Sequence, residues 1–263
     1  MVKAKKYAGR IYAGLIGFLL YSPLLILIVC SFNDSKIRTV WGGFTLHWYT
    51  DLFQNEEVLL AVRTSLILTT SAALIATVIG TLACIAMSAM GKKMKGVMQS
   101  VANIPLLNSE MVTGIAIMLL FVHFMTLGFS SMLIAHVTIG LPYVILNVMP
   151  KLQQVDKNLY EAALDLGASH VYAFVKVILP EIMSGILAGF FFAFTISMDD
   201  FVVTYFTKGA GINTISTMIY QQLRRGINPQ MYALSTLLLF IILILLAIIN
   251  RLSATKEKKE VQY

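Results

Sequence analysis

DKNLYEAALDLGASHVYAFVKVILP, residues 156–180, separates two long apolar segments of the chain and predicts a small helical unit between them. Asp156 can cap an amphipathic helix, in which apolar residues recur at helical spacing: Leu159, Ala162, Ala163 and Leu166. Gly167 suits the C-terminal end of that helix, since glycine adopts a left-handed conformation easily. Ser169 can cap a second helix that runs towards Pro180. The stretch therefore predicts a helix–turn–helix whose small alanine face allows another surface to approach closely.

The composition places this unit in a membrane protein. Of the 263 residues, 58% are hydrophobic and 13% are charged, whereas soluble domains carry about 25% charged residues. The formal net charge of +7 fits lysines at a cytoplasmic face better than nucleic-acid binding, because no basic stripe interleaves with a soluble fold. Cys30 and Cys84 lie far apart in apolar stretches, which predicts small buried side chains rather than a disulfide or a metal site.

Six segments are apolar enough to be spanning helices, which need about 20 such residues. They cover approximately residues 11–31, 64–90, 97–124, 130–149, 182–206 and 231–250. The third is interrupted by Ile104-Pro105 and by Asn108-Ser109-Glu110. The first could instead be a signal peptide, but its apolar run is long and no Ala-x-Ala-like site follows it. The sequence thus predicts an all-α membrane protein with a single transmembrane domain over residues 1–263.

The distribution of Lys and Arg predicts the orientation of these spans. With six spans, both termini and the loops after the second and fourth spans lie on one side, and that side carries 14 of the 20 Lys and Arg residues. The side richer in Lys and Arg is cytoplasmic. We therefore expect both termini, and the loop of residues 150–181, to be cytoplasmic.

The spacing within residues 161–180 resembles the EAA loop of ABC importer permeases. Three residues separate Glu161-Ala162-Ala163 from Gly167, nine separate Gly167 from Val177, and one separates Val177 from Leu179-Pro180. The usual pattern has isoleucine at the position of Val177, a mild departure. The resemblance implies the six-helix fold of type I ABC importer permeases, in a bacterial cytoplasmic membrane. It makes residues 150–181 a coupling loop that docks on a separate ATPase, through Glu161, Ala162, Ala163, Gly167, Leu179 and Pro180.

Other motifs resemble the polyamine branch of that family, the permeases of spermidine/putrescine importers. They are Trp41-Gly42-Gly43-Phe44, His47-Trp48-Tyr49 and Ser197-Met198-Asp199-Asp200. The resemblance implies a second permease subunit, an external substrate-binding protein and an ATPase dimer that binds ATP and Mg. The chain itself has no Gly-x-x-x-x-Gly-Lys-Ser/Thr loop, so we expect it to bind no cofactor and to be no enzyme.

Three carboxylates, Glu110, Asp199 and Asp200, lie within predicted spans, and no Lys or Arg lies deep in any span to pair with them. Each costs about 2.5–3.5 kcal/mol at a helix centre, which suggests that the missing cation is the cargo. Adjacent helical residues point about 100° apart, so only one of the two aspartates can face a narrow path, unless the fifth span ends early and both lie in an outer vestibule. The alternative is that these acids cap helices or form hydrogen bonds within the bundle. Candidate aromatic partners of a polyamine are Tyr21, Trp41, Trp48, Tyr143 and Tyr205.

Other functions fit the sequence less well. The cargo could be another small cation or a metal ion, whereas an anion would require bases along the path. An intramembrane aspartyl protease usually has Gly-x-Gly-Asp, and Ser-Met-Asp precedes Asp200 instead. A secondary carrier would need neither the coupling loop nor an ATPase. His123 and His136 do not form a His-Glu-x-x-His metal site.

Overall fold

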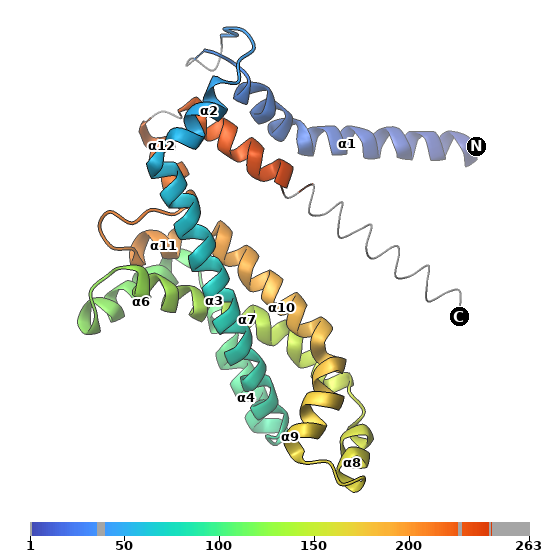
Figure 1. Ribbon diagram of the computed structural model, residues 1–263. Coiled ribbons are helices and arrows are strands. Elements are labelled where there is room, and N and C mark those ends of the chain that lie inside the picture. Colours follow the sequence, from blue (N-terminus) through green and yellow to red (C-terminus); the bar gives the residue numbers. More distant parts are fainter. Residues whose placement is uncertain (1, 36–39, 226–227, 242, 244–263) are drawn as a thin grey trace. The chain divides into compact units, whose positions relative to one another are not determined.

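The computed structural model describes residues 2–35, 40–225, 228–241 and 243, and this part of the chain is almost entirely helical (Figure 1). It forms two compact units, Met1–Leu59 with Gln221–Tyr263, and Leu60–Tyr220. The sequence-based prediction of an all-α fold is confirmed. Nothing in the structure tests which side of the membrane each terminus occupies, so the orientation stays a prediction.

The first unit contains α1 (Val2–Ser31), α2 (His47–Gln54) and the helix Pro229–Ile241. The loop before α2 is organised by Asn33, whose side-chain amide donates to the Val40 carbonyl at 2.8 Å and accepts from the Gly42 amide at 2.8 Å. Trp48 Nε1 donates to the Asn33 carbonyl at 2.8 Å, and the Trp48 side chain is buried. Trp48 therefore stabilises this loop, while Trp41 and Tyr21 are exposed.

The second unit is built around three long helices, α3 (Glu56–Ser88), α7 (Phe129–Gln154) and α10 (Leu179–Asp199). Between them lie α4 (Lys92–Ala102), α5 (Ile104–Leu107), α6 (Glu110–Phe124), α8 (Lys157–Asp165), α9 (His170–Ala173) and the π-helix η1 (Phe174–Ile178). The helices α11 (Val202–Thr207) and α12 (Ile215–Arg225) follow α10. In Figure 1, α6 and α11 lie together near one end of α7 and α10, and α8 and α9 lie at the other end.

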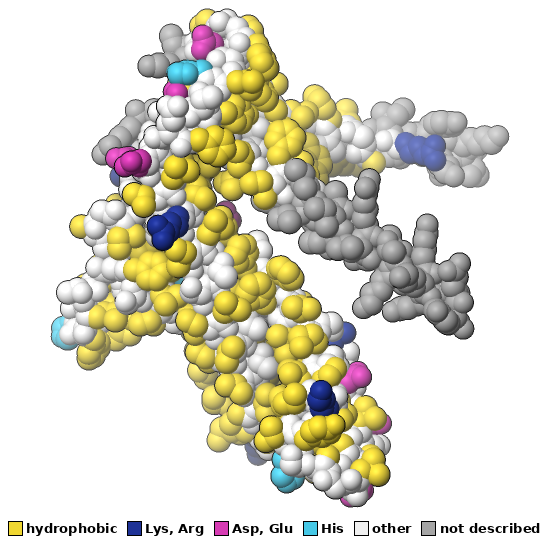
Figure 2. Space-filling model, viewed as in Figure 1, with side chains coloured by type: hydrophobic (Ala, Val, Ile, Leu, Met, Phe, Trp, Pro, Cys, Tyr) yellow, Lys and Arg dark blue, Asp and Glu magenta, His cyan; other side chains and the backbone are white. Residues whose placement is uncertain are grey.

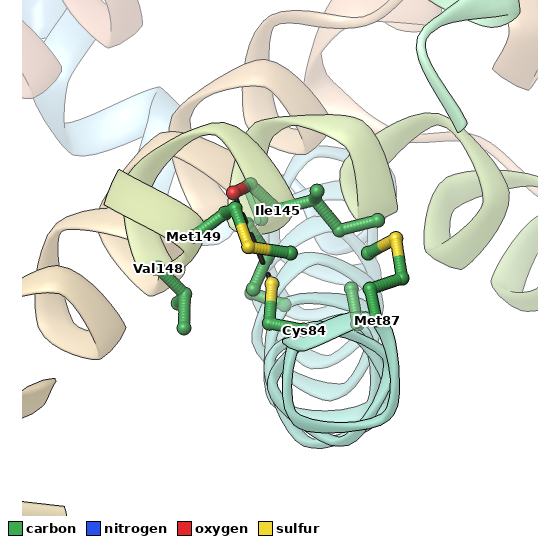
Figure 3. Packing of buried hydrophobic residues seen from close by; sticks show 9 residues of the cluster. Cys84, Met87, Ile145, Val148 and Met149 are labelled. Atoms are coloured by element: carbon green, nitrogen blue, oxygen red, sulfur yellow. Dashed lines mark hydrogen bonds between the residues drawn. The ribbon is translucent and has the colours of Figure 1, made fainter. Parts of the chain in front are cut away.

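The core of the second unit joins α3 to α7. Cys84 and Met87 of α3 pack against Ile145, Val148 and Met149 of α7, and Cys84 Sγ lies 3.9 Å from the Ile145 carbonyl oxygen (Figure 3). Cys84 is a buried free thiol, as the sequence predicted. Small residues let α10 join this core, since a Cβ built on Gly189 would lie 3.1 Å from the Val144 Cα of α7. Close backbone approach through small residues is typical of helices packed within membranes.

Four of the six predicted spans correspond to long apolar helices, and the bounds of the third and fifth predicted spans are corrected. The helical segments Tyr12–Ser31, Glu56–Ser88, Phe129–Gln154 and His170–Asp199 are long and apolar enough to cross a membrane. The third predicted span is divided into α4, α5 and α6, because Pro105 and the cap at Ser109 interrupt it. The fifth ends at Asp199 rather than at residue 206. The sixth is described from Pro229 to Ile241, and most of residues 242–250 lie outside the described residues.

We expect Gly185→Ala to weaken the packing of α10 on α7. A Cβ at this position would lie 2.8 Å from the Asn147 carbonyl oxygen, a backbone atom that cannot move away freely. The substitution should lower the free energy of unfolding by about 1–3 kcal/mol, as overpacked cores do. Gly96→Ala is the matched control, because a Cβ there meets no atom within 4 Å. Thermal unfolding of the purified complex should show a loss of stability for Gly185→Ala alone, and equal midpoints for both variants would contradict this packing.

Candidate functional site

A pocket of about 110 Å³ in the second unit brings together all three predicted carboxylates and one of the predicted aromatic residues. Five helices and the break after α10 supply its lining, which consists of Pro105, Leu106, Glu110, Thr113, Ile139, Tyr143, Ile196, Asp199, Asp200 and Val203. We call it the carboxylate pocket. Its wall contains acids, one phenol, one hydroxyl and aliphatic side chains, but no Lys or Arg. This chemistry suits an organic cation with apolar parts.

Glu110 enters the carboxylate pocket from the first turn of α6. Ser109 caps this helix, and its side chain accepts a hydrogen bond from the Val112 amide at 3.3 Å. Glu110 therefore begins a helix instead of lying inside one, which corrects its predicted position. An acidic residue is favoured there because unpaired N–H groups point out of the helix N-terminus. The Glu110 side chain is exposed, so its charge is available to a ligand.

Thr113 follows Glu110 by almost one helical turn and lines the same pocket. Its hydroxyl oxygen is buried and has no hydrogen-bond partner within the described part of the chain. Buried polar atoms are normally paired, so the Thr113 hydroxyl has a hydrogen-bonding capacity that the described residues leave unused. Thr113 could not be identified from the sequence, because a threonine in an apolar helix is usually a packing residue.

The two aspartates separate at the end of α10. Asp199 is the last residue of the helix, is exposed and lines the carboxylate pocket. Asp200 is buried, and its carboxylate accepts hydrogen bonds from the Val203 amide at 3.2 Å and the Thr204 amide at 2.7 Å. These bonds satisfy the free N–H groups at the start of α11. The Asp200 carboxylate is thus committed to the α10–α11 break, while Asp199 is open to a ligand.

The other predicted aromatic residues are placed differently. Tyr143 of α7 lines the carboxylate pocket, whereas Tyr205 of α11 lies in an aromatic cluster with Phe201 and Tyr220. The Phe201 and Tyr220 rings stack with their centroids 4.0 Å apart. Tyr21, Trp41 and Trp48 belong to the first unit and are not among the residues that line the pocket. Of the two predicted aromatic residues in the second unit, the structure therefore brings Tyr143 to the acids and not Tyr205.

Lys208 lies just after α11 and donates a hydrogen bond to Asn213 Oδ1 at 2.7 Å. Burial lowers the pKa of the Lys208 ammonium below its ordinary value, because desolvation disfavours the charged form. The lysine is directed to this amide oxygen and is not part of the pocket wall.

The predicted helix–turn–helix forms at the opposite end of α10. Asp156 caps α8 by accepting from the Asn158 amide at 3.0 Å, and Ser169 caps α9 by accepting from the Tyr172 amide at 3.3 Å. Gly167 has φ of 87°, so the predicted left-handed turn is confirmed. Tyr160 Oη lies 3.1 Å from His170 Nδ1 and joins the two helices. The sequence predicted these caps correctly because each capping side chain bonds an amide within three residues of itself.

The apolar side of α8 is not covered within the described part of the chain. Leu159 is 47% exposed and Leu166 is 89% exposed, although helical periodicity placed both on the buried side. Glu161 and Ala162 are also exposed. Figure 2 shows charged and histidine side chains around this end, while hydrophobic side chains dominate along the long helices. The exposed surface of α8 thus combines a charged residue, a small alanine and large leucines.

A continuous helical run links this surface to the carboxylate pocket. It extends from His170 to Asp199 and includes η1, where hydrogen bonds skip one residue further than in an α-helix. Pro180 explains the wider turn, because proline has no N–H to bond the carbonyl four residues earlier. Leu179 and Pro180 therefore lie at the start of α10, and Asp199 lies at its end.

Comparison with known proteins agrees with these features. Residues 76–258 match the family of binding-protein-dependent transport system inner membrane components. The chain is 34% identical over 262 residues to the putrescine transport system permease protein PotI of Escherichia coli (strain K12), covering 96% of this chain and 93% of PotI. It is 35% identical over 257 residues to the spermidine/putrescine transport system permease protein PotC of the same strain, covering 95% of this chain and 97% of PotC.

The fold also has a solved counterpart. A bacterial ABC transporter involved in the import of the acidic polysaccharide alginate contains a chain that superposes with a TM-score of 0.71 at 17% sequence identity, covering 95% of this chain and 97% of that chain. This likeness shows the type I ABC importer permease fold. The chain therefore belongs to the binding-protein-dependent transport system inner membrane component family and is a multi-pass inner-membrane permease.

Proposed function

We propose that this chain is a permease subunit of an ATP-driven polyamine importer, and that the carboxylate pocket receives an ammonium group of spermidine or putrescine. The observation that carries the proposal is the placement of two exposed carboxylates, Glu110 and Asp199, in one pocket without a Lys or Arg in its wall. Both curated relatives named above are polyamine permeases, which supports the same cargo.

The lining residues match the chemistry of a polyamine. Carboxylates form strong, charge-assisted hydrogen bonds with ammonium groups, and the unpaired Thr113 hydroxyl can accept another. The Tyr143 ring can cover a cation or a methylene chain. Ile139, Ile196 and Val203 can contact the methylenes between ammonium groups. A polyanion such as alginate would meet only like charges in this pocket.

The coupling loop supplies the connection to ATP. We propose that α8 docks on an ATPase dimer, which binds ATP and Mg, through Glu161, Ala162, Ala163 and Gly167. The exposure of Leu166 and Glu161 supports a partner at this surface. Because one helical run joins the loop to Asp199, a displacement of α8 would be transmitted along α10 to the pocket. A second permease subunit and an external substrate-binding protein complete the proposed importer, and alternating access is the proposed mechanism.

Asp199→Asn and Glu110→Gln should each raise KM for spermidine and putrescine uptake. Removing one charged partner costs roughly 1.5–3 kcal/mol, or roughly 10- to 100-fold in KM. Thr113→Val should raise KM less, because it removes a neutral acceptor. Uptake of labelled polyamine into proteoliposomes that contain the complete complex measures these effects.

The matched control for these variants is Glu181→Gln. Glu181 is an exposed acid of the same helix as Asp199, but it lies 18 residues earlier, which is about 27 Å along an α-helix. Its neutralisation should leave KM unchanged. If the variants Asp199→Asn and Glu110→Gln both keep the wild-type KM, the carboxylate pocket is not part of the transport path.

Glu161→Lys should separate ATP hydrolysis from uptake. The reversed charge lies on the exposed surface of α8, so it should disturb docking without changing the carboxylate pocket. We expect uptake to fall at least tenfold, because the loss of a charged interface contact worth about 1.4 kcal/mol corresponds to a tenfold change. ATPase activity and uptake are measured on the same proteoliposomes, with Glu57→Lys, an exposed acid outside residues 150–181, as the charge-matched control. Normal uptake by Glu161→Lys would overturn the docking role.

A further inference from the structure

His136 is a buried polar residue that none of the functions above uses. It lies in α7, only 1% of it is exposed, and it contacts both sides of the α10–α11 break. Its Nδ1 lies 2.7 Å from Ser197 Oγ of α10, and its Nε2 lies 2.9 Å from Thr204 Oγ1 of α11. A single side chain of α7 therefore connects the last turn of one helix to the first turn of the next.

The hydrogen-bond partners of Thr204 determine which atom donates in each contact of His136. Thr204 has one hydroxyl hydrogen, and the Asp200 carboxylate oxygen at 2.8 Å is its best acceptor. The Thr204 oxygen must then accept from His136, so Nε2 carries the imidazole hydrogen. In a neutral imidazole Nδ1 is consequently an acceptor, and Ser197 donates to it. The bonds run in one direction, from Ser197 through His136 and Thr204 to Asp200.

Asp200 is held by its backbone as well as by its carboxylate. Its N–H donates to the Ile196 carbonyl at 3.0 Å, and its carbonyl accepts from Ser216 Oγ at 2.8 Å. Rotating Asp200 into the pocket would leave the Val203 and Thr204 amides and the Thr204 hydroxyl without an acceptor. Such a loss is costly in a buried site. The network thus fixes the residue that directly follows Asp199.

The geometry of α7 ties this network to the carboxylate pocket. Ile139 and Tyr143, which line the pocket, follow His136 by three and seven residues and therefore lie on the same face of α7. His136 and Tyr143 are about 10 Å apart along the helix axis. One face of α7 thus carries both a pocket wall and the contact that holds the α10–α11 break.

We infer that His136 is a positioning residue for cation transport: through Ser197 and Thr204 it locks the α10–α11 break so that Asp200 stays in its cap and Asp199 is presented to the carboxylate pocket. The inference rests on the proposed function for its cargo, a polyamine. It adds a residue that touches no cargo and acts through Asp199. Without His136, Ser197 of α10 and Thr204 of α11 lose their shared contact with α7, and Asp199 loses its fixed position beside Glu110 and Tyr143.

His136→Leu and His136→Gln form the matched test in the complete complex. Leucine fills the site without a donor, whereas the glutamine amide can donate to Thr204 as Nε2 does. We expect His136→Leu to raise the polyamine KM about tenfold, since hydrogen bonds to a charged network are worth that order, and to leave basal ATPase activity unchanged. His136→Gln should recover most of the loss. If His136→Leu does not assemble, Thr204→Val removes the same connection with little change of shape.

A double-mutant cycle separates positioning from a general structural role. If His136 acts through Asp199, adding His136→Leu to Asp199→Asn should raise KM little further, because coupled residues are not additive. Independent, multiplying effects would overturn the inference and leave the proposed function standing. A wild-type KM for both Asp199→Asn and Glu110→Gln would instead overturn the proposed transport path.

A second measurement does not depend on transport. Cys30 and Cys84 are first replaced by alanine, and Asp199→Cys is then labelled with a cationic methanethiosulfonate reagent. Three such chains are compared: one that keeps His136, one with His136→Leu and one with His136→Gln. The labelling rate should change several-fold with leucine and stay near the His136 rate with glutamine, as expected if the network positions residue 199. Equal rates in all three chains would overturn the positioning role whatever the cargo.

Discussion

The need of the Asp200 carboxylate for hydrogen-bond donors inside an apolar bundle determines the arrangement of the candidate site. A buried carboxylate must be paired or hydrogen-bonded, and here the donors are the free amides of α11 and the Thr204 hydroxyl. Meeting that need ends α10 at Asp199 and starts a new helix at Val202. The helix end then leaves Asp199 exposed at a pocket that also contains Glu110. Satisfying one acid thus frees its neighbour for a ligand.

The same helix carries the other end of the proposed mechanism. The run His170–Asp199 begins beside the cap at Ser169 and ends at the carboxylate pocket. A helix is stiff along its axis, so motion imposed at α8 and α9 reaches Asp199 with little loss. The π-helix at Phe174–Ile178 is the point in this run where the hydrogen-bond pattern changes, and such turns often mark functional positions. In the proposed mechanism, coupling and cargo binding would therefore be connected by one helical run.

Local signals were predictable from the sequence, and signals that depend on distant residues were not. Asp156, Gly167 and Ser169 act on amides or turns within a few residues, so the helix–turn–helix was predicted with its caps. The sequence predicted one span over residues 182–206 and left an early end, or a capping role for the acids, only as alternatives, because periodicity does not show a carboxylate that accepts from the next helix. The structure shows both, with α10 ending at Asp199 and Asp200 capping α11. His136 was read only as failing a metal motif, since its partners are 61 and 68 residues away. The three carboxylates were identified as a group from the sequence, but only the structure distinguishes the buried Asp200 from the exposed Glu110 and Asp199.

The three intramembrane acids differ in how far each is available to a cation. Three intramembrane acids without bases suggested a cation, but the Asp200 carboxylate already accepts three hydrogen bonds within the protein, from the Val203 amide, the Thr204 amide and the Thr204 hydroxyl. Two exposed carboxylates remain at the pocket, Glu110 at a helix N-terminus and Asp199 at a helix C-terminus. The helix dipole favours a negative charge at the first position and disfavours it at the second. Asp199 is therefore the acid with the greater need of a bound cation, and for that reason a positively charged cargo should interact with it more strongly than with Glu110.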